Sequence, residues 1–92
     1  MSVTSNSKAI ESEKIAFNNS SSSEADFESG CRGVVLSTTA NAYIAFDRPA
    51  NADDFLLTAT LSPLVLEHDW QFTKISALGA SGSGTLYMMV RR

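Results

Sequence analysis

The chain lacks the residues that define several large classes of protein. It has one cysteine, Cys31, in 92 residues, so neither an intrachain disulfide nor a zinc site built from thiolates can form. Seven basic residues against ten acidic ones give a net charge of −3, whereas domains that bind nucleic acid carry a basic face. Five glycines and two prolines are too few for a collagen-like or low-complexity chain. We therefore expect a globular domain without a nucleic-acid partner.

Long apolar segments are also missing. The longest apolar runs have four or five residues, far fewer than the roughly 20 that a membrane-spanning helix needs. The first residues, MSVTSNS, have neither the basic region nor the apolar stretch of a secretory signal. We expect no membrane partner, and a chain that stays in a reducing cytosol or leaves it by a route other than secretion.

Size and charge distribution indicate one domain with a polar arm. A chain of 92 residues buries only about 60–65% of the surface that it exposes when unfolded, so its core is thin. The net charge lies entirely in residues 1–30, and the polar run Asn18–Ser23 can bury almost nothing. We expect a flexible, solvated arm at 1–13 and a single domain at 14–92. The alternative is an acidic binding segment at the amino terminus.

The rest of the chain is a series of short apolar runs. Within 85–91, Leu86, Met88 and Val90 fall on one side of an extended chain. Runs of about five residues at spacings near ten are typical of a sandwich or a barrel. At 14–17 we favour a strand over a helix spanning 8–17, because an all-β core needs a sheet partner there. The expected fold is an all-β, antiparallel sandwich of six to eight short strands, at 14–17, 33–37, 42–47, 54–60, 64–68, 74–78 and 85–91.

Turn-forming residues separate these runs, at 38–41, 48–51, 62–63, 69–71 and 79–84. We interpret the last, the glycine-rich Gly79–Gly84, as a hairpin tip. It is not a dinucleotide fingerprint, because Tyr87 stands where the third glycine is required. It is not a nucleophile elbow either, because Ser81 is followed two residues later by Ser83 rather than glycine. No lysine follows to make a phosphate-binding loop.

The only histidine, His68, precedes Asp69. Adjacent strand residues point to opposite faces, so this pair does not form a catalytic dyad, and we interpret it as a surface or rim pair. A metal site would need two or three further ligands, for which only scattered carboxylates are available. A small enzyme that uses His68, Asp69 and the serine-rich loop is therefore the least favoured hypothesis.

Carboxylates occur around two of the turns and one strand end. They could supply oxygen ligands for calcium, but they lack the alternating spacing and central glycine of a calcium loop. Nothing in their spacing selects a pair for glycoside hydrolysis. We interpret Asp53 and Asp54 as turn residues, one of which accepts a backbone hydrogen bond as in an Asx-turn. We expect no catalytic, cofactor-binding or metal-binding residue among these carboxylates, which are Asp47, Asp53, Asp54, Glu67 and Asp69.

Cys31 stands next to Arg32, a neighbour that favours thiolate formation, but no histidine is close in sequence. We interpret Cys31 as a small residue at the start of a strand. Aromatic side chains stack on sugar rings where they share an exposed face, although at this density they more often belong to the core. The four candidates are Tyr43, Trp70, Phe72 and Tyr87, of which Trp70, in an expected turn, is the first to test.

The motifs from Cys31 onward follow one another in a defined order. An Arg-Gly-Val-hydrophobic strand (CRGVVL, 31–36) is followed by a Tyr-hydrophobic strand (AYIAF, 42–46), and the chain closes with an Ile-Ser-Ala segment (75–78), a glycine-rich turn (81–85) and a last strand (86–90). This order resembles a family of small structural proteins of tailed bacteriophages, over residues 14–92. The resemblance implies a sandwich of jelly-roll type. It carries over no functional residues, because these proteins act through surfaces.

The resemblance also implies a function and partners. It indicates a head decoration or cement protein of the virion, made in the host cytoplasm and bound non-covalently to the major capsid protein or other virion subunits. It favours a homo-oligomer, with a trimer preferred, and open strand edges independently invite another chain to pair. The alternative is a receptor- or carbohydrate-binding module of a tail, fibre or neck, with Tyr43, Trp70 and Tyr87 as stacking platforms. We expect a chain without residues 1–13 to fold but to bind the particle more weakly.

Overall fold

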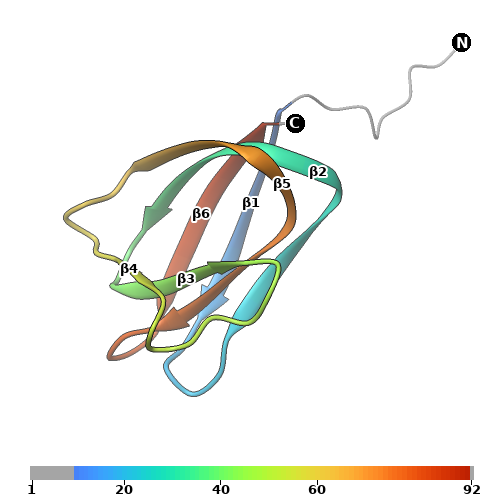
Figure 1. Cartoon of the computed structure of the whole chain (residues 1–92). Helices are drawn as coiled ribbons and strands as arrows, with labels where there is room; N and C mark the ends of the chain where they lie inside the picture. Colours follow the sequence, from blue (N-terminus) through green and yellow to red (C-terminus); the bar gives the residue numbers. More distant parts are fainter. Residues whose placement is uncertain (1–9, 92) are drawn as a thin grey trace, which may run out of the picture.

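The structure, a computed structural model, describes residues 10–91, apart from the side chains of residues 28, 29 and 68–70. All regular secondary structure in this range is β-strand, and every strand pairing is antiparallel. The expected all-β, antiparallel class is therefore confirmed. The strands are β1 (Ile10–Phe17), β2 (Ser23–Thr38), β3 (Ala42–Phe46), β4 (Phe55–Leu57), β5 (Leu64–Gly79) and β6 (Gly84–Arg91) (Figure 1).

The strands pair in a nested order. β1 pairs with β6, β2 with β5, and β3 with β4. Further pairings of β2 with β6 and of β3 with β5 join them into one sheet, in the order β1-β6-β2-β5-β3-β4. Within residues 10–91, only β3 and β4 are neighbours both along the chain and in the sheet. The remaining connections therefore link strands that do not pair with each other, and the jelly-roll type stays a prediction.

The sheet folds over itself because β2 and β5 are long and irregular in the middle. Each has 16 residues, and their register shifts between Asp26 and Cys31 and again between Cys31 and Gly33. Such bulges bend a strand and increase its twist. The first layer contains β1, β6, the second half of β2 and the first half of β5. The second layer contains the first half of β2, the second half of β5, β3 and β4 (Figure 1).

The core fills the space between the two layers. Phe72 lies at the bend and contacts Phe27 and Phe46 edge to face, with ring centroids 6.5 Å and 4.9 Å apart. Burying a side chain of this size contributes about 1.5–3 kcal/mol. Phe72 is thus a core residue, as is usual for aromatic side chains in so small a domain. Other buried side chains from both layers are Val34, Leu36, Ile44, Leu57, Ile75, Leu86, Met88 and Val90.

The amino-terminal third contributes to this core, and residues 10–13 of the expected arm belong to β1. β1 begins at Ile10, four residues before the expected domain boundary, and its first residues pair with Met88–Arg91 of β6. Phe17, Ala25 and Phe27 are buried. The charges of this segment do not prevent burial, because alternate residues of a strand point to opposite sides. Residues 1–9 of the expected arm lie outside the described residues.

Two expected turns differ in the structure. Residues 69–71 continue β5, because the register shift with β2 accommodates the bend without breaking the strand. Gly79–Gly84 joins β5 to β6, which do not pair with each other, so it connects the layers and is not a hairpin tip. The other expected turns, at 38–41, 48–51 and 62–63, do separate strands.

Candidate functional site

One face of the first layer exposes several large apolar side chains. Tyr87 and Met89 point outward from β6, since the residues that alternate with them are buried. The register places Met89 beside Val35 of β2, and Val35 beside Val65 of β5. Ile10 lies at the start of β1, on the same side of the sheet. We call the surface formed by Ile10, Val35, Val65, Tyr87 and Met89 the outer apolar face.

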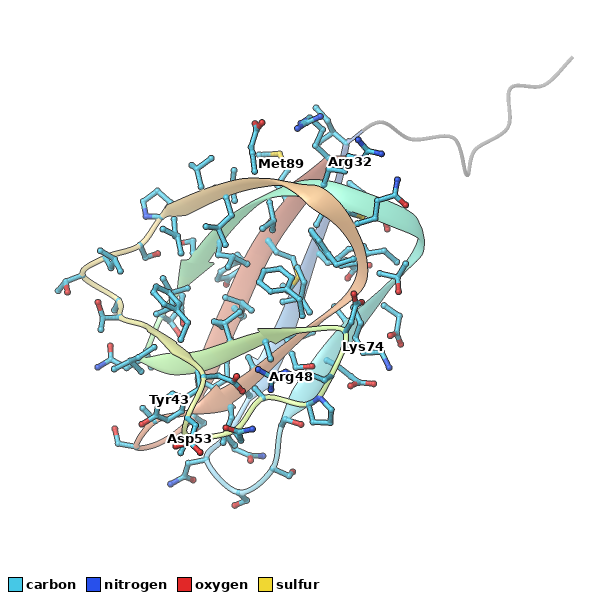
Figure 2. The ribbon with its side chains drawn as sticks, viewed as in Figure 1. Arg32, Tyr43, Arg48, Asp53, Lys74 and Met89 are labelled. Carbon is cyan, nitrogen blue, oxygen red and sulfur yellow. The ribbon has the colours of Figure 1, made fainter. Side chains whose placement is uncertain are left out.

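The outer apolar face is well exposed. Four of its side chains are between 44% and 64% exposed, and Val35, between them, is half-buried. A shallow groove of about 180 Å³ runs along Ile10, Val35, Val65 and Met89, and Met89 lies on the outside of the ribbon (Figure 2). Single apolar residues are ordinary on protein surfaces, whereas a contiguous set marks a candidate interaction site.

An ion pair borders this face. Arg91 of β6 reaches across Gly33 of β2 to Glu67 of β5, with an Nη2–Oε1 distance of 3.1 Å. Gly33 leaves room for this crossing, because a Cβ there would lie 3.3 Å from the Arg91 guanidinium. The neighbouring cross-strand row consists of Ser12, Met89, Val35 and Val65, and it carries no charged side chain. An apolar centre with a charged border is the usual arrangement of a protein–protein interface.

The carboxylates near the β3–β4 connection hold that loop together. Arg48 donates to both carboxylate oxygens of Asp54, with an Nη1–Oδ2 distance of 2.9 Å. The N–H of Asn51 donates to the same carboxylate at 2.8 Å. The Oδ1 atom of Asn51 in turn accepts the N–H of Asp53 at 2.8 Å. Asp54 therefore accepts a backbone hydrogen bond, as expected, but the Asx-turn itself is formed by Asn51 and not by Asp53 or Asp54.

These hydrogen bonds shift the pKa values of Arg48 and Asp54. The side-chain hydrogen bonds from Arg48 hold the pKa of Asp54 below its ordinary value of 3.8, and the N–H of Asn51 acts in the same direction. The same partnership raises the pKa of Arg48. A carboxyl with a lowered pKa in the folded state contributes stability above pH 3.8, and this contribution is lost as the pH falls through the lowered pKa. The pair therefore stabilises the loop.

The same loop covers part of the outer surface of the second layer. Asp47, at a φ of 62°, accepts the N–H groups of Thr73 and Lys74 on its Oδ1 atom, at 2.9 Å and 3.2 Å. The buried Ser76 hydroxyl donates to a loop carbonyl oxygen at 2.7 Å, and Ala50 of the loop is buried. Asp47, Asp53 and Asp54 are thus parts of a structural loop, and Glu67 belongs to the ion pair of the first layer.

The candidate stacking residues do not share one face. Tyr43 points outward from the second layer, whereas Tyr87 points outward from the first. Phe72 is buried. The side chains of His68, Asp69 and Trp70 lie outside the described residues. A stacking platform that combines Tyr43 with Tyr87 is therefore not formed, and Tyr87 belongs to the outer apolar face.

Cys31 lies within β2, not at its start, and is buried without a disulfide. Arg32 is exposed, since neighbouring strand residues face opposite sides, so its charge does not lie beside the thiol. Among the described side chains, no group of three or more His, Cys, Asp or Glu residues could hold a metal ion. Residues 10–91 also contain no helix long and apolar enough to cross a membrane.

Sequence reasoning missed the outer apolar face. The alternation in 85–91 placed Tyr87 and Met89 on one side of a strand, opposite Leu86 and Met88. Because both sides of this strand carry apolar residues, the alternation identified the side that faces the core but did not predict an exposed apolar surface on the other side. The available signal was this two-sided apolar character, which recurs around Val65.

The chain matches no protein-family model, no curated protein and no solved structure.

Proposed function

We propose that the chain is a structural protein of a tailed-phage particle, a capsid cement or decoration protein that resides in the virion. It stabilises the head through non-covalent contacts with the major capsid protein or other virion subunits. The observation that carries the proposal is the outer apolar face of the first layer. The order of the motifs from Cys31 onward supports the choice of particle.

The shape of the face favours a protein partner. A small molecule needs a concave pocket that buries most of its surface, whereas the groove along this sheet is shallow. Removing apolar surface from water contributes about 25 cal/mol per Å². A second protein surface can cover the whole face at once and so gain this contribution from all five side chains.

The face is also held rigidly. Tyr87 and Met89 belong to β6, which pairs with β1 on one edge and β2 on the other. Val35 belongs to β2, which pairs with β6 and β5. Binding therefore requires little ordering of the backbone, which lowers the entropy cost of association. A cement protein needs such a surface, because it must bind without rearranging the shell.

The charged groups near the candidate sites support a structural role rather than catalysis. Asp47 and Asp54 hold the β3–β4 loop. The Nζ atom of Lys74 in β5 lies 3.3 Å from the Oε1 atom of Glu24 in β2, so this ion pair joins the two strands. Glu67 pairs with Arg91. Each of these side chains is used to join strands or to fix a loop.

Binding to particles tests the proposal. Particles assembled without the chain are incubated with purified protein, and the bound fraction is quantified over a concentration series. We expect Met89→Lys to weaken binding at least about tenfold, because it buries a charge at the centre of the face. The matched control is Leu56→Lys, which changes an exposed apolar residue of the second layer. We expect it to bind like the unmodified chain.

Circular dichroism and urea unfolding verify that both variants fold. Equal occupancy by Met89→Lys and the unmodified chain contradicts the assignment of this face. The carbohydrate-binding alternative predicts instead that a glycan array finds a specific ligand whose binding Met89→Lys leaves unchanged and Trp70→Ala removes.

A further inference from the structure

The first half of β5 has one open edge. Residues Leu64–Glu67 pair with β2 on one side. On the other side, β3 reaches only as far as Ile75, and no backbone hydrogen bond to Leu64–Glu67 joins that side within residues 10–91. Such an edge presents N–H and C=O groups to which another strand can pair.

The sandwich is open beside this edge. A groove of about 180 Å³ enters between the layers there and has an almost wholly apolar lining. Phe55 of β4 stands at its mouth and is 53% exposed, although its strand register places it on the core side, opposite Ile44. Leu61, in the loop that joins β4 to β5, is also exposed. The lining residues are Leu36, Ile44, Phe46, Phe55, Leu64 and Leu66.

The edge at the other end of the sheet is protected by charge. Two copies of one strand can extend a sheet across a two-fold axis only if residues of the same face meet. When two β1 strands pair about their middle, Glu13 of one copy lies opposite Glu13 of the other. Moving the centre of the pairing by one residue sets Lys14 opposite Lys14 in one direction and Glu11 opposite Glu13 in the other. Like charges directly opposite each other are destabilising. Self-pairing of β1 is therefore disfavoured.

We propose that the open edge of β5 pairs with the same edge of a second copy of this chain. In the central two-fold register, Val65 lies opposite Val65 of the second copy, and Leu64 opposite Leu66. One alternative register sets Pro63, which has no N–H, opposite Val65. The other sets Val65 opposite Glu67. The central register alone sets each of Leu64, Val65 and Leu66 opposite an apolar residue of the same three, with Glu67 opposite Pro63 at each end. The middle of the edge is therefore self-complementary.

This pairing makes the two first layers into one eight-stranded sheet. The row of Met89, Val35 and Val65 continues without interruption into the second copy. The inward-facing Leu64 and Leu66 of the second copy lie beside the open groove and reduce its exposure. The inference goes beyond the proposed function, since the dimer forms whether or not the outer apolar face binds a shell. It replaces the trimer favoured by the resemblance with a two-fold dimer.

The size of the contact sets the expected affinity. A standard interface buries about 800 Å² on each partner. Four or five paired residues cover less than this, and Phe55, which lines the groove with Leu64 and Leu66, adds apolar area next to the pairing. We therefore expect a dimer that dissociates in roughly the micromolar range, so the measurement needs a concentration series.

Sedimentation velocity of the full chain, from about 1 μM to about 1 mM, tests the pairing. The mass is expected to rise from one copy to two. Val65→Lys sets two lysines opposite each other and is expected to raise the dissociation constant at least about tenfold. Met89→Lys, in the same row but two strands away, is the matched control and is expected to leave it unchanged. A monomer throughout, a trimer, or a dimer that Val65→Lys does not weaken would overturn the proposal.

A cross-link provides a second test. Residues opposite each other in antiparallel strands have Cα atoms about 4.5–5.5 Å apart, within the range that a disulfide spans. Val65→Cys is therefore expected to form a covalent dimer on oxidation, while Met89→Cys remains a monomer. The native Cys31 is fully buried and does not compete. Equal cross-linking of the two variants contradicts the proposed register of the dimer. The particle-binding result of Met89→Lys does not depend on this outcome.

Discussion

Two adjacent methionines give the sharpest test of the strand register on which the outer apolar face depends. Met88 is 3% exposed and packs in the core, whereas Met89 is 44% exposed and points outward. The substitutions Met88→Ala and Met89→Ala remove the same atoms from neighbouring positions of one strand. Any difference between them therefore comes from the face on which each side chain lies.

The burial of each side chain sets the expected magnitude. Truncating a fully buried methionine to alanine costs about 2–5 kcal/mol, because the lost apolar contacts leave a cavity. Met89 has about half of its side chain covered, and its replacement leaves no enclosed cavity, so the cost is about 1 kcal/mol or less. We expect the free energies of unfolding of the two variants to differ by at least about 1.5 kcal/mol.

Urea unfolding followed by circular dichroism measures this difference, at concentrations where the chain is monomeric. The denaturant slope must be equal in both variants, so that a change of midpoint reports stability. A one-residue shift of the strand would exchange the faces of all its side chains. Equal destabilisation by the two substitutions, or a larger effect of Met89→Ala, would refute the register and with it the outer apolar face.

Three further outcomes are expected. Gly84→Ala lowers stability by about 1–3 kcal/mol, since its Cβ would lie 2.8 Å from a core side chain. Gly82→Ala, whose Cβ would have no atom within 4 Å, leaves the urea midpoint unchanged. Equal urea midpoints for the two variants would contradict the packing around Gly84. Asp54→Asn lowers stability at pH 7, and the deficit shrinks as the pH falls below 3.8, because the unmodified carboxylate then becomes protonated; a deficit that does not change between pH 7 and pH 3 would contradict the lowered pKa. Removing all residues before Lys14 destabilises the domain because it deletes half of β1, whereas removing those before Ile10 keeps every pairing with β6; equal thermal midpoints for the two truncations would contradict that strand assignment.

Local alternation predicts much of this fold. The runs at 42–47 and 85–91 correspond closely to β3 and β6, because each has a clear apolar side and is bounded by turn residues. The strand favoured at 14–17 is part of β1. Residues 54–60 are a strand only at Phe55–Leu57, since a turn begins at Thr58, whose carbonyl oxygen accepts the N–H of Leu61 at 3.0 Å.

Features that depend on distant partners could not be predicted in this way. Residues 23–32 contain charges, serine and glycine, and they form a strand because the second half of β5 pairs beside them. Trp70 lies in β5 although its neighbours resemble a turn, because β2 follows the same bend. A turn at Asp53 and Asp54 was predictable from the sequence, whereas the Asx role of Asn51 and the link of Asp54 to Arg48 required the folded loop.

The outer apolar face also depends on pairing between strands that are distant in the sequence. Val35, Val65 and Met89 come from three strands that are far apart in the sequence, and only the register sets them side by side. Each residue taken alone is unremarkable in a strand with two apolar sides. The functional feature of this chain is therefore a property of strand order, which alternation within one run does not reveal.

Cross-linking on intact particles tests whether the outer apolar face binds the shell. A photoreactive amino acid replaces Met89 on the outer apolar face, and in a separate variant it replaces Leu56 on the opposite layer. We expect irradiation to join position 89, and not position 56, to a shell subunit identified by mass spectrometry. Cross-links from position 56 alone, or particles that retain neither variant, would contradict it.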